Sequence, residues 1–225
     1  MVLQRRVLKR RDYERMGIPA TLWSVDANKV PPGALMFLRR YAGRLEELLR
    51  RPAGAYFLGP KGVGKTGAAV LLLKYIKEHG FSCLFISVGE LRQALRGRVQ
   101  FDTDTSVWDR AKEVDALVLD ELRAADAGEA VLGARDLEDL LEHRYQFRKA
   151  TFITTRMTVS ERLSTFAGLV SKTTGYLVDV PVDGQDQREA LKNSLTESLV
   201  AESATPPSSS HRPAPVPPNK TRGHY

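Results

Sequence analysis

Apolar residues along this chain occur either in short continuous runs or at helical intervals. Five short runs rich in β-branched and aromatic residues predict strands, at residues 55–58, 83–88, 116–119, 151–155 and 176–180. Helical spacing predicts helices at residues 34–50, 65–79, 90–98, 135–148 and 160–172. Strands that are apolar throughout are buried on both faces, which is typical of a parallel sheet covered by helices. We therefore expect a three-layer α/β domain with a five-stranded parallel sheet.

The composition changes towards both ends of the chain. Residues 1–16 hold six Lys or Arg and two acids, whereas residues 205–225 hold six prolines and no acid. The latter stretch has too little apolar surface to offset its ordering entropy, so we expect a disordered tail from about residue 205. A plain tether and a polyproline docking strip are both compatible with it. We expect a basic segment at 1–16, a folded core at 17–190 and an extension at 191–225.

The net charge of +7 belongs to the ends, because residues 52–204 carry 19 basic against 22 acidic residues. Basic ends suit contact with phosphates or an acidic partner, and they also serve solubility. In the first segment the cations cluster among apolar residues, as on a short amphipathic helix. The candidate DNA-binding residues are Arg5, Arg6, Lys9, Arg10 and Arg11.

Cysteine and hydropathy exclude two classes of protein. Cys83 is the single cysteine, so the chain forms no internal disulfide, and we expect a reducing compartment. The longest apolar run, residues 68–73, is far shorter than the roughly 20 residues that span a bilayer. Residues 1–11 carry arginines where a signal peptide would be apolar. We expect a cytoplasmic protein, in a bacterium or a phage-infected cell, that makes no membrane contact.

Residues 59–66 read GPKGVGKT and fit the phosphate-loop pattern G-x-x-x-x-G-K-[ST]. The pattern stands after a predicted strand and opens a predicted helix, as its mechanism requires. Backbone amides would surround the phosphates, Lys65 would reach the β- and γ-phosphates, and the Thr66 hydroxyl would coordinate Mg²⁺. The predicted nucleotide-binding residues are Gly59, Pro60, Lys61, Gly62, Val63, Gly64, Lys65, Thr66 and Gly67.

A second element of the site follows the third predicted strand. The apolar run at 117–119 leads directly into Asp120 and Glu121. The carboxyl ends of parallel strands form the ligand crevice, so both acids are expected beside the phosphate loop. Asp120 would hold Mg²⁺, and Glu121 would polarise the attacking water, a base that an ATPase needs. No guanine-reading Asn-Lys-x-Asp string follows the loop, which favours ATP over GTP.

Several motifs together resemble the AAA+ ATPases of the DnaC/IstB type. They are Gly17-Ile18-Pro19, Trp23, the phosphate loop, residues 117–121, His143-Arg144-Tyr145 and residues 151–155. The resemblance spans about residues 12–190 and implies a replicative-helicase loader or the ATPase helper of a transposase. It implies an AAA+ core without a full helical lid, and it places Ile18, Pro19 and Trp23 near the adenine. Core packing accounts for the tryptophan equally well.

Two catalytic positions depart from that family. Arg156 stands where a sensor asparagine usually contacts the γ-phosphate, and Lys172 is the cation nearest the place of the trans-acting arginine finger. Lysine lacks the planar fork of arginine, and a finger contributes about 10³ to 10⁵ in rate, so we expect slow or partner-stimulated hydrolysis. Arg162 is an alternative finger, although pairing on a solvated helix face explains it better.

The sequence therefore supports three hypotheses. The first is a loader-like ATPase that assembles as a homo-oligomer through its nucleotide sites on DNA, with single-stranded DNA preferred, or on a DNA-bound helicase during replication. The second is a transposition helper that coats duplex DNA. The third is a nucleotide-binding scaffold that does not hydrolyse ATP.

Overall fold

The computed structural model describes residues 6–100, 107–124, 134–186, 192–193 and 196–197. Within these residues the sheet has five parallel strands in the order β2-β3-β4-β1-β5. The strands are β1 (Gly54–Leu58), β2 (Cys83–Ser87), β3 (Ala116–Leu122), β4 (Ala150–Thr155) and β5 (Leu177–Pro181). The predicted fold class is confirmed, because each predicted strand is present and all of them are parallel.

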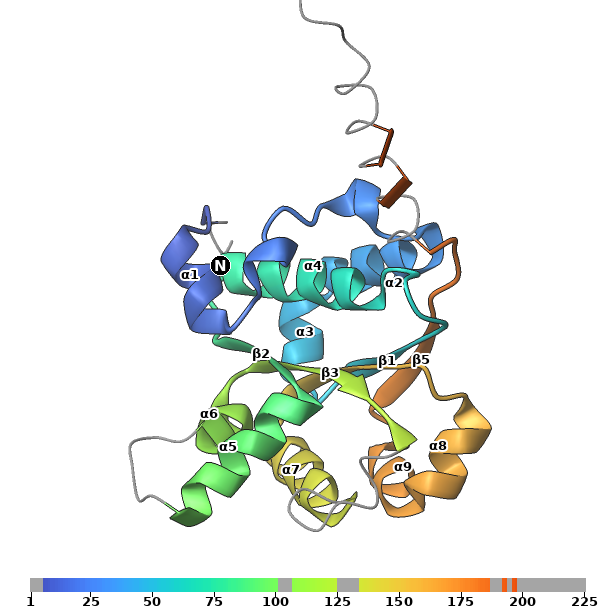
Figure 1. Cartoon of the computed structure of the whole chain (residues 1–225). Coiled ribbons are helices and arrows are strands. Elements are labelled where there is room, and N and C mark those ends of the chain that lie inside the picture. Colours follow the sequence, from blue (N-terminus) through green and yellow to red (C-terminus); the bar gives the residue numbers. More distant parts are fainter. Residues whose placement is uncertain (1–5, 101–106, 125–133, 187–191, 194–195, 198–225) are drawn as a thin grey trace, which may run out of the picture. The chain divides into compact units, whose positions relative to one another are not determined.

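Helices cover both faces of the sheet (Figure 1). On one face lie α1 (Arg10–Met16), α2 (Pro32–Gly43), α3 (Leu45–Leu49) and α4 (Lys65–Glu78). On the other lie α5 (Val88–Gln100), α6 (Val107–Glu113), α7 (Ala134–Gln146), α8 (Val159–Thr165) and α9 (Ala167–Thr173). Two 3₁₀ turns, η1 (Ala20–Leu22) and η2 (Ala27–Lys29), lead from α1 to α2.

Each strand contributes side chains alternately to two hydrophobic cores. In β1, Ala55 and Phe57 join the core beneath α2 and α4, while Tyr56 joins the core above α5, α7 and α9. Successive side chains of a strand point to opposite faces. The strands β1 to β4 are buried on both faces, which is why their central parts appear in the sequence as largely apolar runs. The edge strand β5 is mostly exposed.

The structure corrects several predicted helices. The helix expected at 34–50 is broken at Arg44, whose φ of −127° leaves the helical region. The helix expected at 160–172 is broken at Phe166, which has a φ of −128°. Phe166 is only 1% exposed and belongs to the core above α5, α7 and α9. Both breaks turn the chain so that short apolar segments reach a core, and local periodicity does not contain that requirement. The pattern analysis also missed α6, a short helix anchored by buried Trp108.

The basic segment differs from the expected amphipathic helix. Residues 6–9 are not helical, and α1 begins at Arg10. Arg6 donates its backbone N–H to Glu78 O over 2.9 Å, which places the segment at the end of α4. Residues 1–5 and the tail predicted from residue 205 lie outside the described residues. No helix in the described part of the chain is both long and apolar enough to cross a membrane.

Candidate nucleotide-binding site

The phosphate loop connects β1 to α4, as the motif predicts. Gly62 and Gly64 have φ values of 84° and 96°, a region that side chains other than glycine rarely adopt. Gly64 is the N-cap of α4, so the helix begins at Lys65 with its free amides facing the loop. Val63 is only 1% exposed and anchors the loop in the core beneath α2 and α4. The backbone thus forms an anion-binding turn at a helix N-terminus.

Lys65 lies over the loop that it is expected to serve. Its ammonium donates to Gly59 O at 2.8 Å and to Pro60 O at 2.5 Å. These bonds hold the cation inside the phosphate loop, at the position from which it would contact phosphate oxygens.

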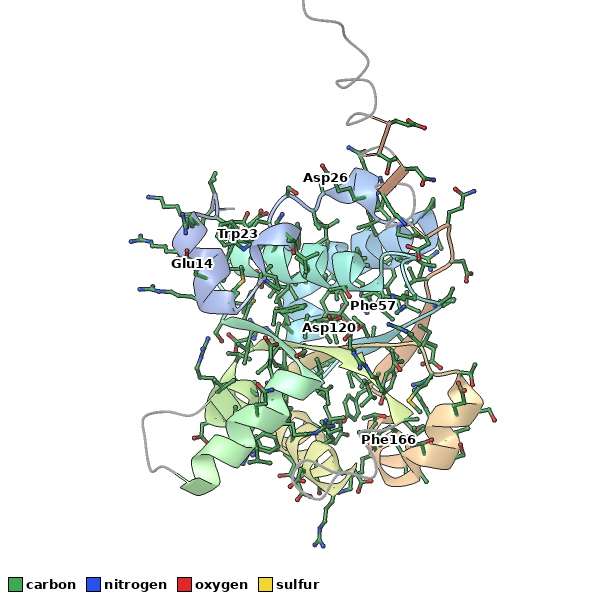
Figure 2. All side chains as sticks on the ribbon, viewed as in Figure 1. Glu14, Trp23, Asp26, Phe57, Asp120 and Phe166 are labelled. Carbon is green, nitrogen blue, oxygen red and sulfur yellow. The ribbon has the colours of Figure 1, made fainter. Side chains whose placement is uncertain are left out.

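Asp120 joins the two sequence motifs into one site. Its Oδ1 accepts hydrogen bonds from the Thr66 hydroxyl at 2.9 Å and from the Thr154 hydroxyl at 2.6 Å. Figure 2 labels Asp120 on the sheet, at the end of the apolar run of β3. The structure therefore brings Thr66 and Asp120, which are 54 residues apart, into direct contact.

Thr154 is a site residue that the sequence analysis missed. Besides its bond to Asp120, its hydroxyl oxygen accepts the backbone N–H of Glu121 at 2.9 Å. The available signal was the polar pair Thr154-Thr155 at the carboxyl end of the strand, directly after Phe152 and Ile153. The adjacent Thr155 hydroxyl instead donates to Leu122 O at 2.8 Å and ties β4 to β3.

A β-bulge orients the two acids. The register of β3 against β4 shifts between Leu119 and Leu122, and Glu121 has a φ of 62°. Bulges re-aim side chains next to functional sites, and a left-handed φ is uncommon for a residue with a Cβ. Asp120 is buried whereas Glu121 is partly exposed. The local geometry gives adjacent acids different environments.

Two arginines flank Glu121. Arg123 forms an ion pair with Glu121 Oε2, and Arg156 lies 3.8 Å from Oε1. The structure thus brings Arg156, the residue at the expected sensor position, to the edge of the predicted site. In this arrangement its guanidinium faces the carboxylate that we expect to polarise water.

Burial raises the pKa of the Asp120 carboxyl above its usual value, against the lowering effect of the hydrogen bonds from Thr154 and Thr66. Desolvation penalises a buried negative charge, so a bound cation would relieve an existing cost. The Thr66 hydroxyl and the Asp120 carboxylate are the hard oxygen donors that Mg²⁺ prefers. Their contact therefore fits a magnesium site completed by nucleotide phosphates and water.

A carboxylate from beyond β5 also reaches the phosphate loop. A Cβ on Gly62 would lie 1.9 Å from Asp186 Oδ1, so only glycine allows this approach. The sequence analysis did not identify Asp186, and nothing in the local pattern marks it. The Asp186 carboxylate therefore lies against the part of the loop that is expected to bind phosphate oxygens.

The tryptophan of the Gly-Ile-Pro region does not lie at the phosphate loop. Trp23 stacks on Tyr13 with ring centroids 5.5 Å apart, and its indole N–H donates to Ile18 O at 2.8 Å. Figure 2 shows Trp23 beside α1, well away from Asp120. Ile18 is buried and Pro19 is exposed. Packing accounts for Trp23, and Val25 is the residue that approaches Gly67, at 3.7 Å from a Cβ placed there.

The two candidate trans-acting cations have partners within the same chain. Lys172 pairs with Glu142 near the protein surface, and that hydrogen bond raises the pKa of its ammonium. Arg162 is only 3% exposed, pairs with Asp179 at 2.6 Å and lies 4.0 Å from the centroid of the Tyr56 ring. The interpretation that Arg162 pairs on a solvated helix face is wrong, because its side chain is buried and pairs with Asp179 of β5.

Two of the candidate DNA-binding cations also have partners within the chain. Arg6 pairs with Asp12, and Arg10 pairs with Glu14 at 2.8 Å while lying 5.7 Å from the Trp23 ring centroid. Lys9 and Arg11 are exposed, and Arg5 lies outside the described residues. The segment remains a predicted DNA contact, but acidic side chains partly neutralise the charge of Arg6 and Arg10.

Comparison with known proteins agrees with this geometry. Residues 47–179 match the family described as IstB-like ATP binding protein. The crystal structure of the DnaC helicase loader superposes with a TM-score of 0.64 at 21% identity, covering 73% of this chain and 100% of that one. The structure of DnaI gives 0.62 at 23%, covering 75% and 96%. AMPPCP-bound DnaA from Aquifex aeolicus gives 0.55 at 17%, covering 77% and 56%. No match was found among curated proteins.

The fold is the α/β fold of P-loop NTPases, and it matches the DnaC-like AAA+ structures. The family match covers more than half of the chain, from α3 into β5. The chain belongs to the IstB-like ATP-binding proteins.

Proposed function

We propose that this protein is an ATPase that uses its nucleotide state to assemble on DNA or on a DNA-bound helicase during replication. The observation that carries the proposal is the contact between Thr66 and Asp120, which joins the phosphate loop to the acid pair. With Mg²⁺ and ATP bound, the metal would neutralise phosphate charge. Lys65 would bind the phosphates, Asp120 with Thr66 would hold the cation, and Glu121 would orient water.

Slow or partner-stimulated hydrolysis follows from the surroundings of Glu121. Arg123 and Arg156 both reach its carboxylate, and a water-orienting base works best when its oxygen is available to that water. A DNA-bound or neighbouring subunit that drew Arg156 towards the γ-phosphate would release one of these contacts. Lys172 is the proposed cation contributed by the next subunit of a homo-oligomer, and it would first have to leave Glu142.

DNA and a helicase are the proposed partners. The solved structures that share the fold include a helicase loader and a DnaA replication initiator bound to single-stranded DNA. Lys9 and Arg11 are two of the exposed cations of the basic segment, and through this segment the chain would contact phosphates. If alanines at Arg5, Arg6, Lys9, Arg10 and Arg11 leave affinity for single-stranded DNA unchanged at low salt, this segment is not the DNA contact.

A transposition helper is the second candidate, and the family match favours it. In that role the protein would prefer duplex DNA and form ATP-dependent filaments. A third candidate, a scaffold that binds ATP without turnover, is favoured by the ion pairs that occupy Glu121.

The ATPase rate with and without single- and double-stranded DNA distinguishes these functions. Turnover that DNA stimulates and that Lys65→Ala and Glu121→Gln both abolish is the result expected of the ATPase. Stimulation by single-stranded DNA supports the loader, whereas stimulation by duplex supports the transposition helper. Tight ATP binding without turnover, unchanged in Glu121→Gln and with either DNA, would leave the scaffold as the remaining function.

A further inference from the structure

A cavity of about 520 Å³ lies at the end of the sheet opposite to the phosphate loop. It reaches Gly54, the first residue of β1, whereas the phosphate loop follows Leu58 at the other end of that strand. A five-residue strand is roughly 15 Å long, so a ligand here would not compete with ATP. Its lining includes Tyr41, Arg44, Arg51, Tyr145 and Tyr176.

One exposed aromatic ring in this cavity lies against a buried one. Tyr145 stacks on Tyr176 with centroids 4.7 Å apart and an interplanar angle of 28°. The Tyr41 hydroxyl donates to Ala53 O at 2.9 Å, and the Tyr176 hydroxyl reaches Leu141 O at 3.5 Å. Tyr145 itself remains 49% exposed. A fixed ring with an exposed partner is a platform on which a further planar group can stack.

The rim of the cavity has an excess of positive charge. Arg44 and Arg51 share one carboxylate, that of Glu47, at 2.7 and 3.6 Å. The two arginine side chains are 60% and 70% exposed. One carboxylate neutralises only one guanidinium, so a net positive charge remains beside the aromatic rings. Arg50 and Arg148, which follow α3 and α7, are also exposed.

We propose that this aromatic–arginine pocket, defined by Tyr145, Tyr176, Arg44 and Arg51, binds single-stranded DNA. An unpaired base would stack on Tyr145, and Arg51 and Arg44 would contact the neighbouring phosphates. Stacking platforms beside cations are the means by which proteins hold single strands, because every base has a flat face. Duplex DNA cannot use the pocket in this way, since its bases are stacked on one another. The inference rests on the proposed action on DNA and names where this chain would hold the strand.

The test is the affinity of the full chain for a fluorescent oligo-dT at low salt, with Mg²⁺ and AMPPCP. Tyr145→Ala and Arg51→Glu should each weaken binding about tenfold or more, in line with the usual contribution of a stacked base. Tyr145→Phe keeps the ring and should bind as the unmodified protein does. Glu47→Gln removes the carboxylate that competes with DNA phosphates and should bind more tightly.

Two matched controls lie outside the pocket. Phe147 is 60% exposed and packs on His143 at 4.5 Å, so Phe147→Ala removes an exposed ring from the same end of α7. Arg135→Glu makes the same charge change as Arg51→Glu in the first turn of that helix. Both should leave the affinity within about twofold. Thermal unfolding of every variant identifies any that fails to fold, and Arg51→Glu, on the surface, then decides.

Oligo-dT affinity that is unchanged in both pocket variants overturns the proposal, as does a loss of equal size in the controls. Equal binding of duplex, or tighter binding of oligo-rU than of oligo-dT, overturns the assignment to single-stranded DNA. The ATPase proposal fails separately. A protein that hydrolyses ATP but binds no oligo-dT lacks this site, whereas one that binds oligo-dT through Tyr145 without turnover has the site but is not an ATPase.

Discussion

Asp120 is the residue through which the phosphate loop contacts the central strands of the sheet. Its carboxylate is buried, and one oxygen accepts both the Thr66 and the Thr154 hydroxyls. Burial of a carboxylate is costly unless the charge is compensated. Burial of the Asp120 charge therefore lowers the stability of the nucleotide-free protein, and a bound cation would relieve this penalty. Substitutions of individual residues should reveal the penalty.

Asp120→Asn should leave the free energy of unfolding of the nucleotide-free protein unchanged or higher at pH 7, and should abolish Mg²⁺-dependent ATP binding. Burial raises the pKa of this carboxyl, so the folded protein binds its proton more tightly than the unfolded chain does. The contribution to stability is present at acidic pH and is lost as the pH rises through the folded pKa. Denaturant unfolding from pH 4 to 8 should show any advantage of the variant shrinking towards acidic pH. A variant clearly less stable at pH 7 would contradict this account.

Asp186→Asn should tighten ATP binding by about 1 kcal/mol, roughly fivefold, because it removes a negative charge from a loop built to bind anions. Isothermal titration with Mg²⁺-ATP measures the effect. Asp183→Asn is the matched control, since Asp183 is an exposed carboxylate on the same segment. Equal affinities in all three proteins would show that Asp186 does not oppose the nucleotide.

At the scale of elements, a buried arginine fastens α7 to the strands. Arg144 is fully buried and donates to Thr151 Oγ1 at 2.8 Å and to Ala111 O at 2.6 Å. It also donates to the carbonyl oxygens of Lys112, Val114 and Ala150. The guanidinium thus satisfies acceptors at the end of α6 and the start of β4, which no lysine could do, because it lacks the planar fork. The motif His143-Arg144-Tyr145, part of the resemblance to the DnaC/IstB type, thus contains a residue with a structural role.

Arg144→Lys should lower the free energy of unfolding by about 3 kcal/mol, because buried carbonyl oxygens would lose their donors. Urea unfolding of the nucleotide-free protein measures the change. The control Arg148→Lys alters an exposed arginine one turn later and should stay within about 0.5 kcal/mol. A loss below 1 kcal/mol in Arg144→Lys would mean that water or lysine replaces these bonds.

At the scale of the whole molecule, the candidate nucleotide site and the proposed DNA pocket lie at opposite ends of the strands. The phosphate loop, Asp120 and Thr154 lie at the carboxyl ends of the strands, and the aromatic–arginine pocket lies at the other ends. Both are connected to β1, at its last and first residues. Nucleotide binding should therefore stabilise the whole unit.

Saturating Mg²⁺-ATP should raise the melting temperature by roughly 5–10 °C, since a ligand at 100 times its Kd adds about 2.7 kcal/mol to a folded domain. Differential scanning fluorimetry measures the shift. Lys65→Ala should show almost none, because Lys65 is the cation held within the phosphate loop. An equal shift in both proteins would place ATP elsewhere.

The sequence alone determined the layered sheet and the two halves of the nucleotide site. Continuous apolar runs such as residues 83–86 indicate burial on both faces, and the phosphate loop needs glycines at fixed spacing for its backbone conformation. Both features are local, because a few consecutive residues determine the burial of a strand or the backbone conformation of the loop. They could be predicted without any knowledge of what packs against them.

Only the tertiary structure decided which side chains meet. Thr154 joins Asp120 because β4 lies beside β3, and β5 brings Asp179 to the buried Arg162. Trp23 packs on Tyr13 of α1. The breaks at Arg44 and Phe166 arise from distant packing in the same way. Contacts between residues far apart in the chain depend on strand order and on the shape of the cores, which no local pattern contains.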